Sequence, residues 1–151
     1  MNAKNVAFRA ARATDWPAIS DLLAQHHLPP AGAEEYLPDF IVAEIDGTLA
    51  ACAGLEICGD AALLRSSAVA ARYRGQSLGT ELTRRIIEHA RLRGVRRVAL
   101  LTTTAEDFFA RAGFVRVERD ALPDALHASE EFRGACPASA AAMVLMLTPA
   151  E

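Results

Sequence analysis

The first apolar pattern in the chain has the period of a strand. Residues 6–12 alternate apolar and polar side chains, as a half-buried strand does. The next residues, 14–17 (TDWP), supply a helix N-cap and a first-turn proline, so a helix is predicted to run to about His26. The segment HLPPAGAEEYLPD then predicts a loop or a short helix.

Two β-rich runs come next, in residues 40–57 (FIVAEIDGTLAACAGLEI). They flank Asp46-Gly47, a dipeptide that favours a tight hairpin turn. Residues 61–70 predict a further strand, with Gly59-Asp60 as the turn before it.

A helical period follows, and it is the strongest pattern in the chain. Leu78, Leu82, Ile86 and Ala90 recur at helical spacing, and Gly94 stands where a C-terminal cap belongs. The sequence therefore predicts an amphipathic helix that ends just before this glycine.

The last third of the chain alternates between the period of a strand and the period of a helix. It predicts strands at residues 97–103, 114–119 and 140–147, and a short helix at residues 105–112 that Gly113 stops. Hairpins mixed with helical crossovers indicate an α+β fold: one mixed, mostly antiparallel sheet of about seven strands flanked by about four helices. Because repeats and linkers are absent from the sequence, residues 1–151 are predicted to form a single domain.

Composition agrees with a globular chain. Of 151 residues, 52% are hydrophobic and 23% are charged, which lies outside the disordered range. The first residues contain no apolar core of signal-peptide length, and no apolar run has the length of a membrane span. We therefore expect a cytoplasmic protein that does not bind membranes.

The net charge of −3 conceals a basic segment. Nine of the 16 basic residues lie between Arg65 and Arg97, together with only two of the 19 acidic ones. The remainder of the chain is therefore acidic. This asymmetry favours a local anion site over a nucleic-acid surface, although a solvated helix face would also explain it.

The cysteines and histidines do not have metal-site spacing. The three cysteines form no CxxC pair, and the four histidines form no HxxxH pair. We expect no metal, and we expect Cys52 and Cys58 to be buried and reduced because both lie in apolar runs.

Residues 72–82 (RYRGQSLGTEL) connect a predicted strand to the long helix. The turn and the free N–H groups of the first helical turn would point at one spot, which is an arrangement that attracts phosphate. Gly75 and Gly79 let a ligand approach the backbone, and Arg72 and Arg74 add positive charge. The alternative is an ordinary helix start.

The residues around this turn resemble the GNAT superfamily of acyl-CoA-dependent N-acyltransferases. RGQSLG stands between LRSSAV and LTTTAEDFFARAGFVRV, and that family binds the coenzyme A pyrophosphate with such a loop. Ser77 departs from the family's middle glycine and, as a non-glycine residue, is expected to avoid strongly positive φ. The resemblance implies acetyl-CoA as the cofactor. It implies these contact residues: Ala68, Val69, Ala70, Arg74, Gly75, Gln76, Ser77, Leu78, Gly79, Thr80, Thr102 and Phe108.

The same resemblance implies direct attack of an amine on the acetyl thioester, with the pantetheine arm in a gap between two diverging strands. The backbone N–H of Val69 is the candidate to stabilise the oxyanion. The family's usual tyrosine acid falls on Phe109, so this acid is missing, and Tyr36 is an alternative. Glu56 is the candidate base or holds the water that acts as one; the alternative is an exposed glutamate at a strand end.

The acceptor is predicted from two narrower resemblances. The chain resembles the acetyltransferase domain of N-acetylglutamate synthases and small GNAT proteins encoded with arsenic-resistance genes. Both imply a small, amino-acid-like amine. The predicted acceptor-binding residues are Arg65 or Arg133 for a carboxylate, with Ser66, Ser67 and Ser139 as hydrogen-bonding neighbours.

Two residues qualify this prediction of the acceptor. Thr104 stands where the glutamate enzymes have an arginine, which argues against glutamate itself. Cys136 is either a structural cysteine or a reactive thiol near the acceptor.

Three functions remain open from sequence. The leading one is an N-acetyltransferase of small amines; a non-catalytic acyl-CoA sensor and an enzyme that acetylates protein termini or lysines are the alternatives. No nucleic acid is expected as a partner, and a homodimer is left open.

Overall fold

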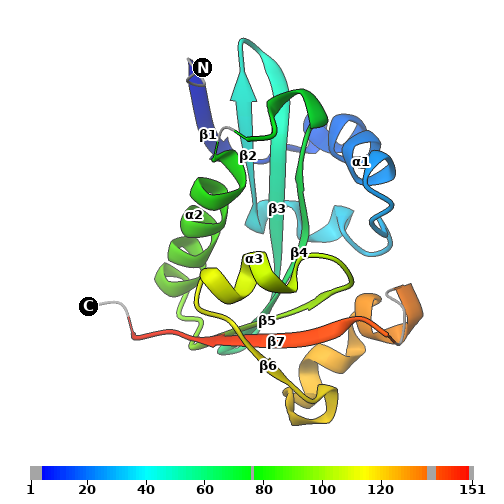
Figure 1. Cartoon of the computed structure of the whole chain (residues 1–151), viewed down its shortest axis with the longest axis vertical. Helices are drawn as coiled ribbons and strands as arrows, with labels where there is room; N and C mark the ends of the chain where they lie inside the picture. The colour runs from blue at the N-terminus through cyan, green and yellow to red at the C-terminus, as the bar shows by residue number, and fades with distance from the viewer. Residues whose placement is uncertain (1–4, 76, 136–138, 150–151) are drawn as a thin grey trace.

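A single seven-stranded sheet, in the order β1-β2-β3-β4-β5-β7-β6, forms the centre of the computed structural model, which describes residues 5–75, 77–135 and 139–149 (Figure 1). The strands are β1 (Val6–Ala10), β2 (Phe40–Ile45), β3 (Thr48–Cys58), β4 (Ala61–Val69), β5 (Arg97–Thr102), β6 (Val115–Val117) and β7 (Ala141–Met146). Only β4 and β5 pair in parallel, and the other neighbours are antiparallel. The predicted α+β fold class is confirmed.

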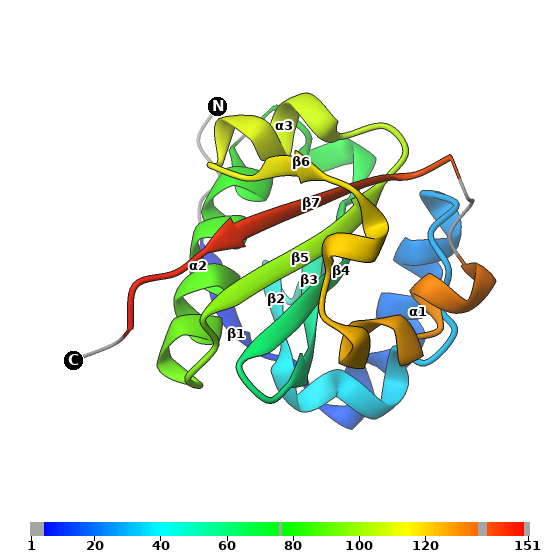
Figure 2. The ribbon, with the colours of Figure 1, turned by 90° about the horizontal axis from the view of Figure 1, so that it is seen from below.

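Helices cover both faces of this sheet. The α-helices of the described residues are α1 (Trp16–Gln25), α2 (Leu78–Leu92) and α3 (Glu106–Arg111). Short turns of tighter or irregular helix are η1 (Ala13–Asp15), η2 (Glu34–Asp39), η3 (Ala71–Tyr73), η4 (Arg119–Ala121), η5 (Asp124–Ala128) and η6 (Glu131–Ala135). Figure 2 shows α2 and α3 on one side of the strands, with α1, η5 and η6 on the other.

Helix α2 follows the predicted apolar face. Leu82, Ile86 and Ala90 are buried in the cluster that the helix forms with the sheet. Gly94 has a φ of 87°, and the helix closes with hydrogen bonds from Gly94 N to Arg91 O (3.1 Å) and from Val95 N to Ala90 O (3.0 Å). The predicted C-terminal cap is therefore confirmed as a Schellman motif.

Helix α1 packs on the opposite face of β2 and β3. Ile19 and Leu23 are fully buried there, against the ring of Phe40. A Cβ atom on Gly54 would lie 2.0 Å from this ring, so only glycine allows the aromatic ring to approach β3 so closely.

Strand β4 contains a bulge. In the register with β3, Cys52 pairs with Ala68 and Gly54 with Arg65, so two residues, Ser66 and Ser67, oppose one. Ser66 has a φ of 60°, and this left-handed conformation accommodates the extra residue.

Toward their C-terminal ends, β4 and β5 lie apart. Their parallel pairing covers only Ala61 with Arg97, Ala62 with Val98 and Leu63 with Ala99. The remaining residues of both strands separate, as expected, and leave a gap in the middle of the sheet.

Strand β6 is shorter than predicted. The sequence pattern extends over residues 114–119, but only Val115–Val117 pair with β7. Val115 and Arg116 are both exposed, so burial does not extend the strand, and the chain turns into η4 at Arg119.

The start of α1 was correctly predicted, but Asp15 is used differently from a standard N-cap. Its carboxylate makes no cap bond to the helix. It accepts two hydrogen bonds from Arg9, at 2.8 and 2.9 Å, and one from the backbone N–H of Arg12 at 2.7 Å. The bond to Arg9 is the main cause that lowers the pKa of Asp15 to about 2.

This ion pair predicts an acid-sensitive contribution to folding. A carboxyl group whose pKa is lowered by folding stabilises the fold above its unfolded pKa, and this stabilisation is lost as the pH falls through the folded pKa. We expect Asp15→Asn to lower the free energy of unfolding by about 2 kcal/mol at pH 7 and by much less near pH 2. Urea unfolding at several pH values measures this. Asp21→Asn, on the exposed side of α1, is the control, and an equal loss at both pH values would contradict the prediction.

Two other features are absent from the described residues. No helix in this part of the chain has the length and apolar character to cross a membrane. Within the same residues, no three His, Cys, Asp or Glu side chains gather as metal ligands.

Candidate active site

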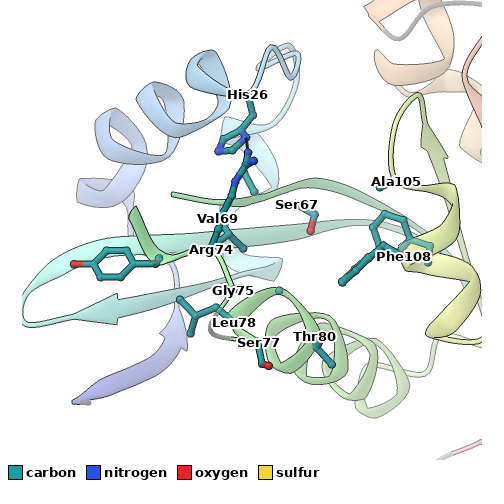
Figure 3. Close-up of a pocket in the computed structure, with 14 residues that line it drawn as sticks. His26, Ser67, Val69, Arg74, Gly75, Ser77, Leu78, Thr80, Ala105 and Phe108 are labelled. Carbon is teal, nitrogen blue, oxygen red and sulfur yellow. Dashed lines mark hydrogen bonds between the residues drawn. The ribbon is translucent and has the colours of Figure 1, made fainter. Parts of the chain in front are cut away.

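A cavity of about 580 Å³ lies at the end of β4, beside the gap between β4 and β5. It is bounded by the end of β4, the start of α2, the end of α1 and one side of α3 (Figure 3). Its lining residues are His26, Ser67, Ala68, Val69, Tyr73, Arg74, Gly75, Ser77, Leu78, Gly79, Thr80, Ala105, Phe108 and Phe109. We call it the loop cavity, because the predicted phosphate loop forms one wall. Most predicted cofactor residues line it; Gln76 lies outside the described residues.

The start of α2 supplies backbone donors to this cavity. The first hydrogen bond of the helix runs from Glu81 N to Ser77 O (3.1 Å), so the N–H groups of Leu78, Gly79 and Thr80 have no acceptor within the helix. All three residues line the loop cavity. Aligned amides at a positive helix end form an anion site.

Ser77 contradicts one expectation from sequence. It has φ 62° and ψ 18°, the left-handed conformation that it was expected to avoid. Its side chain makes no cap bond, so the loop imposes this conformation. The loop therefore keeps at this position a conformation that suits glycine, in spite of the serine.

This conformation predicts a stabilising substitution. The left-handed region costs a non-glycine residue roughly 1–2 kcal/mol, and the greater freedom of glycine in the unfolded chain offsets part of the gain. We expect Ser77→Gly to raise the free energy of unfolding by about 0.5 kcal/mol, while Ser77→Ala, which keeps the strain, leaves it unchanged. Chemical denaturation measures both, and a loss of stability in Ser77→Gly would contradict the assignment.

Arg74 reaches across the loop cavity to the end of α1. Its Nη2 atom lies 3.1 Å from Nδ1 of His26, and Figure 3 shows this contact as a dashed line. Since arginine is only a donor, Nδ1 accepts, and the ring proton is on Nε2. His26 thus holds the arginine beside the amides of α2.

The backbone of β4 has donors on two sides. Ala70 N donates to Ala50 O at 2.8 Å, and donors alternate sides along an antiparallel strand. The N–H of Val69 therefore points away from β3 and into the gap. Ala70 differs from its prediction as a cofactor contact: it does not line the cavity, its N–H is bound to β3, and its carbonyl accepts from Tyr73 N at 2.9 Å.

A smaller cavity of about 160 Å³ adjoins the loop cavity and lies between β4 and β5. Its lining residues are His27, Leu28, Pro29, Leu64, Arg65, Ser66, Ser67, Leu100, Leu101, Thr102, Thr103, Thr104, Ala105, Phe109, Glu131 and Ala140. The two cavities share Ser67, Ala105 and Phe109, so they meet at these three residues. We call the smaller one the side cavity.

Arg65 lines the side cavity but is not open to a ligand as predicted. Its side chain is 0% exposed and forms ion pairs with Glu56 at 2.6 Å and with Glu131 at 3.2 Å. Glu56 also differs from the exposed alternative: its carboxylate is buried, accepts a further bond from Ser129 Oγ at 3.1 Å, and lines neither cavity. Glu56 therefore lies where it fixes the side chain of Arg65.

The other predicted acceptor residues divide into two groups. Ser66 and Ser67 line the side cavity, although Ser66 Oγ accepts a hydrogen bond from Arg65 Nε at 3.1 Å. Arg133 and Ser139 are exposed and do not line it, so no contact with an acceptor follows from their positions.

Two predicted contacts lie near the junction of the cavities. Thr102 lines the side cavity rather than the loop cavity, and its Oγ accepts a hydrogen bond from Ala105 N at 2.9 Å, which shapes the turn before α3. Phe108 lines the loop cavity, with its ring edge-to-face on Phe109 at 5.0 Å.

Phe109 is the residue at which the resemblance implies a missing acid. Its ring lies at the junction of the cavities, packs edge-to-face on Phe114 at 5.6 Å and carries no hydroxyl group. The alternative acid, Tyr36, lines neither cavity, and burial, followed by the charge of Glu56, raises its pKa.

The cysteines take no part in the described site. Cys52 is buried, and burial raises its pKa to about 12; Cys58 is half-buried, and both are free thiols. Cys136 lies outside the described residues. The predicted burial is confirmed for Cys52, whereas Cys58 is only half-buried.

Sequence reasoning missed several residues of the two cavities. His26 and Tyr73 line the loop cavity, and His27 and Glu131 line the side cavity. No local pattern marks them, because α1, η3 and η6 bring them together only in the folded chain. The position of Tyr73 directly before the loop is the one signal that could have been used.

The fold and the loop at the start of α2 define a class of transferases. The profile of the Acetyltransferase (GNAT) family matches residues 7–114, and the chain belongs to this family. The resemblance found in RGQSLG and its flanking strands is confirmed.

Curated relatives include amino-acid acetyltransferases. One, from Neisseria meningitidis, is 30% identical over 131 residues, which cover 79% of this chain and 29% of the relative. Another, from Pseudomonas fluorescens, is 37% identical over 94 residues, covering 61% of this chain and 22% of the relative. The chain thus spans less than a third of the length of these proteins.

Solved structures have the same fold over nearly the whole chain. N-acetylglutamate synthase from Neisseria gonorrhoeae, complexed with coenzyme A and N-acetyl-glutamate, matches with a TM-score of 0.82 and 26% identity, covering 95% of this chain and 35% of that one. A Mycobacterium tuberculosis protein in complex with CoA and NLQ matches with a TM-score of 0.80 and 26% identity, covering 94% and 99%.

Proposed function

We propose that this chain transfers the acetyl group of acetyl-CoA to the amine of a small, amino-acid-like acceptor. The observation that carries the proposal is the junction of two cavities at Ser67, Ala105 and Phe109, in the gap between β4 and β5. A loop cavity with helix-end amides suits a diphosphate, and the side cavity suits a small second substrate. Solved relatives complexed with coenzyme A support the choice of cofactor.

Each wall of the loop cavity has a proposed role. The N–H groups of Leu78, Gly79 and Thr80 bind the diphosphate. The guanidinium of Arg74 binds it as well, after breaking its hydrogen bond to His26. The N–H of Val69 points into the gap and donates to the acetyl oxygen as negative charge develops on it.

The departure of the thiol needs little help from an acidic side chain. The neutral amine attacks the acetyl carbon, a C–N bond forms and the C–S bond breaks, and the excess amine proton leaves to solvent or to the thiolate. A thiol with a pKa of about 8.5 leaves as thiolate near neutral pH at a cost of only about 2 kcal/mol. An active enzyme is therefore compatible with Phe109 at the position of the usual tyrosine. Glu56 contributes to the site by holding Arg65.

A non-catalytic acyl-CoA sensor is the second candidate, and the missing hydroxyl at Phe109 is the observation that favours it. Calorimetry with acetyl-CoA, followed by thiol-release assays over amino acids and their phosphorus and arsenic analogues, separates the two. Such analogues belong in the panel because of the resemblance to arsenic-resistance GNAT proteins. Binding with turnover supports the transferase, binding without turnover supports the sensor, and absence of binding rejects both.

A further inference from the structure

Arg65 is a buried cation that contacts two carboxylates. Its Nη1 donates to Glu56 Oε2 at 2.6 Å, and its Nη2 lies 3.2 Å from Glu131 Oε2. The same guanidinium donates to Pro29 O at 2.9 Å and to Ser66 Oγ at 3.1 Å. Four groups from four segments therefore surround the guanidinium.

Only one of these two carboxylates faces the side cavity. Glu131 lines the side cavity together with Arg65, whereas Glu56 does not. The only other ionisable side chain among the described residues that line this cavity is His27, at the end of α1. The permanent cation of the side cavity is thus already paired, on the cavity side, by a carboxylate of the protein.

The position of Glu131 is fixed by a shared serine. Ser129 Oγ donates to Glu56 Oε2 at 3.1 Å and accepts from Glu131 N at 3.1 Å. Both carboxylate side chains are almost fully buried, at 3% and 6% exposure. A ligand carboxylate would have to displace a preorganised group, rather than enter an open site.

We propose that Glu131 sets the charge selectivity of the acceptor site, because it occupies the side of Arg65 that an acceptor carboxylate would need. With one guanidinium between two carboxylates, a third carboxylate meets repulsion at close range in a poorly solvated cavity. The end of the acceptor that reaches Arg65 is therefore uncharged, and acidic side chains are rejected. This inference rests on the proposed function, since it assigns the acceptor to the side cavity.

Glutamate and glutamine test the proposal because they differ only at the end of the side chain, which is a charged carboxylate in glutamate and an uncharged amide in glutamine. Calorimetry on the CoA-loaded protein should show that glutamine binds at least roughly tenfold more tightly than glutamate. In Glu131→Gln, which keeps the shape and removes the charge, this preference should fall to about threefold or less. The matched control is Glu130→Gln, which removes the same charge from an exposed neighbour and should keep the wild-type preference.

The outcomes separate this inference from the proposed function. Equal binding of both amino acids by the wild type, an unchanged preference in Glu131→Gln, or no binding of either ligand overturns the charge selectivity. Thiol release with any amine would still support the transferase in those cases. If Glu131→Gln fails to fold by circular dichroism, Glu131→Ser is measured in the same way. The expected binding ratios without thiol release would leave the selectivity in place and reject the transferase.

Discussion

A Gly79→Glu variant should lose at least about 100-fold in affinity for acetyl-CoA, a loss of roughly 2.7 kcal/mol, and still fold. Gly79 lies in the first turn of α2 and lines the loop cavity. A glutamate there places a carboxylate beside the amides that would bind the diphosphate, so it repels the ligand and blocks the backbone. Calorimetry measures the affinity, and circular dichroism checks the fold.

Gly79→Ala is the matched control. A Cβ atom at this position would lie 3.6 Å from Val69 and 3.7 Å from Phe108, which are ordinary contact distances. The backbone is helical there, so alanine introduces no strain, and we expect only a few-fold change in affinity. Unchanged affinity in Gly79→Glu would mean that the diphosphate does not bind at the start of α2.

The second large effect concerns stability. Arg65→Met should lower the free energy of unfolding by about 3–5 kcal/mol, because it leaves the carboxylates of Glu56 and Glu131 buried without their cation. Thermal and urea unfolding measure this loss. The exposed arginine of the same region provides the control: Arg133→Met should change the free energy of unfolding by less than about 0.5 kcal/mol.

A double variant tests the cause of this loss. If the unpaired charge destabilises Arg65→Met, then adding Glu56→Gln should recover at least about 1 kcal/mol, since the two positions are coupled through the ion pair. A strictly additive loss would show that the arginine stabilises the fold by packing alone.

Most of the fold could be predicted from local patterns. The apolar face of α2, the glycine that ends it and the Asp46-Gly47 turn all follow from residues close in sequence, and Asp46 and Gly47 have the positive φ values of such a turn. The exceptions depend on contacts between distant segments. The length of β6 is limited by its pairing with β7, and the carboxylate of Asp15 binds Arg9 rather than α1.

The site was predictable only in part, for a related reason. The loop has a local signature, so the residues around Gly79 could be assigned to it before the fold was known. Arg65 has no such signature, because its partners are 9 and 66 positions away in the chain and come from β3 and η6. An arginine beside serines therefore suggested a ligand contact, whereas tertiary structure pairs it internally. Ser77 shows that tertiary structure can also override the preference of a residue for negative φ.

The bulge in β4 changes how this strand must be compared with others. Before it, Leu64 points toward α2; after it, Ala68 packs with α1 and Val69 packs with Leu78 of α2. In a regular strand Ala68 and Val69 would exchange sides, since side chains alternate strictly. Deleting one serine would remove the extra residue and keep alanine on the α1 side and valine on the α2 side, now in a strand without a bulge. A comparison with a strand that lacks the bulge must therefore skip one residue after Arg65, because otherwise every later side chain is assigned to the wrong side of the sheet.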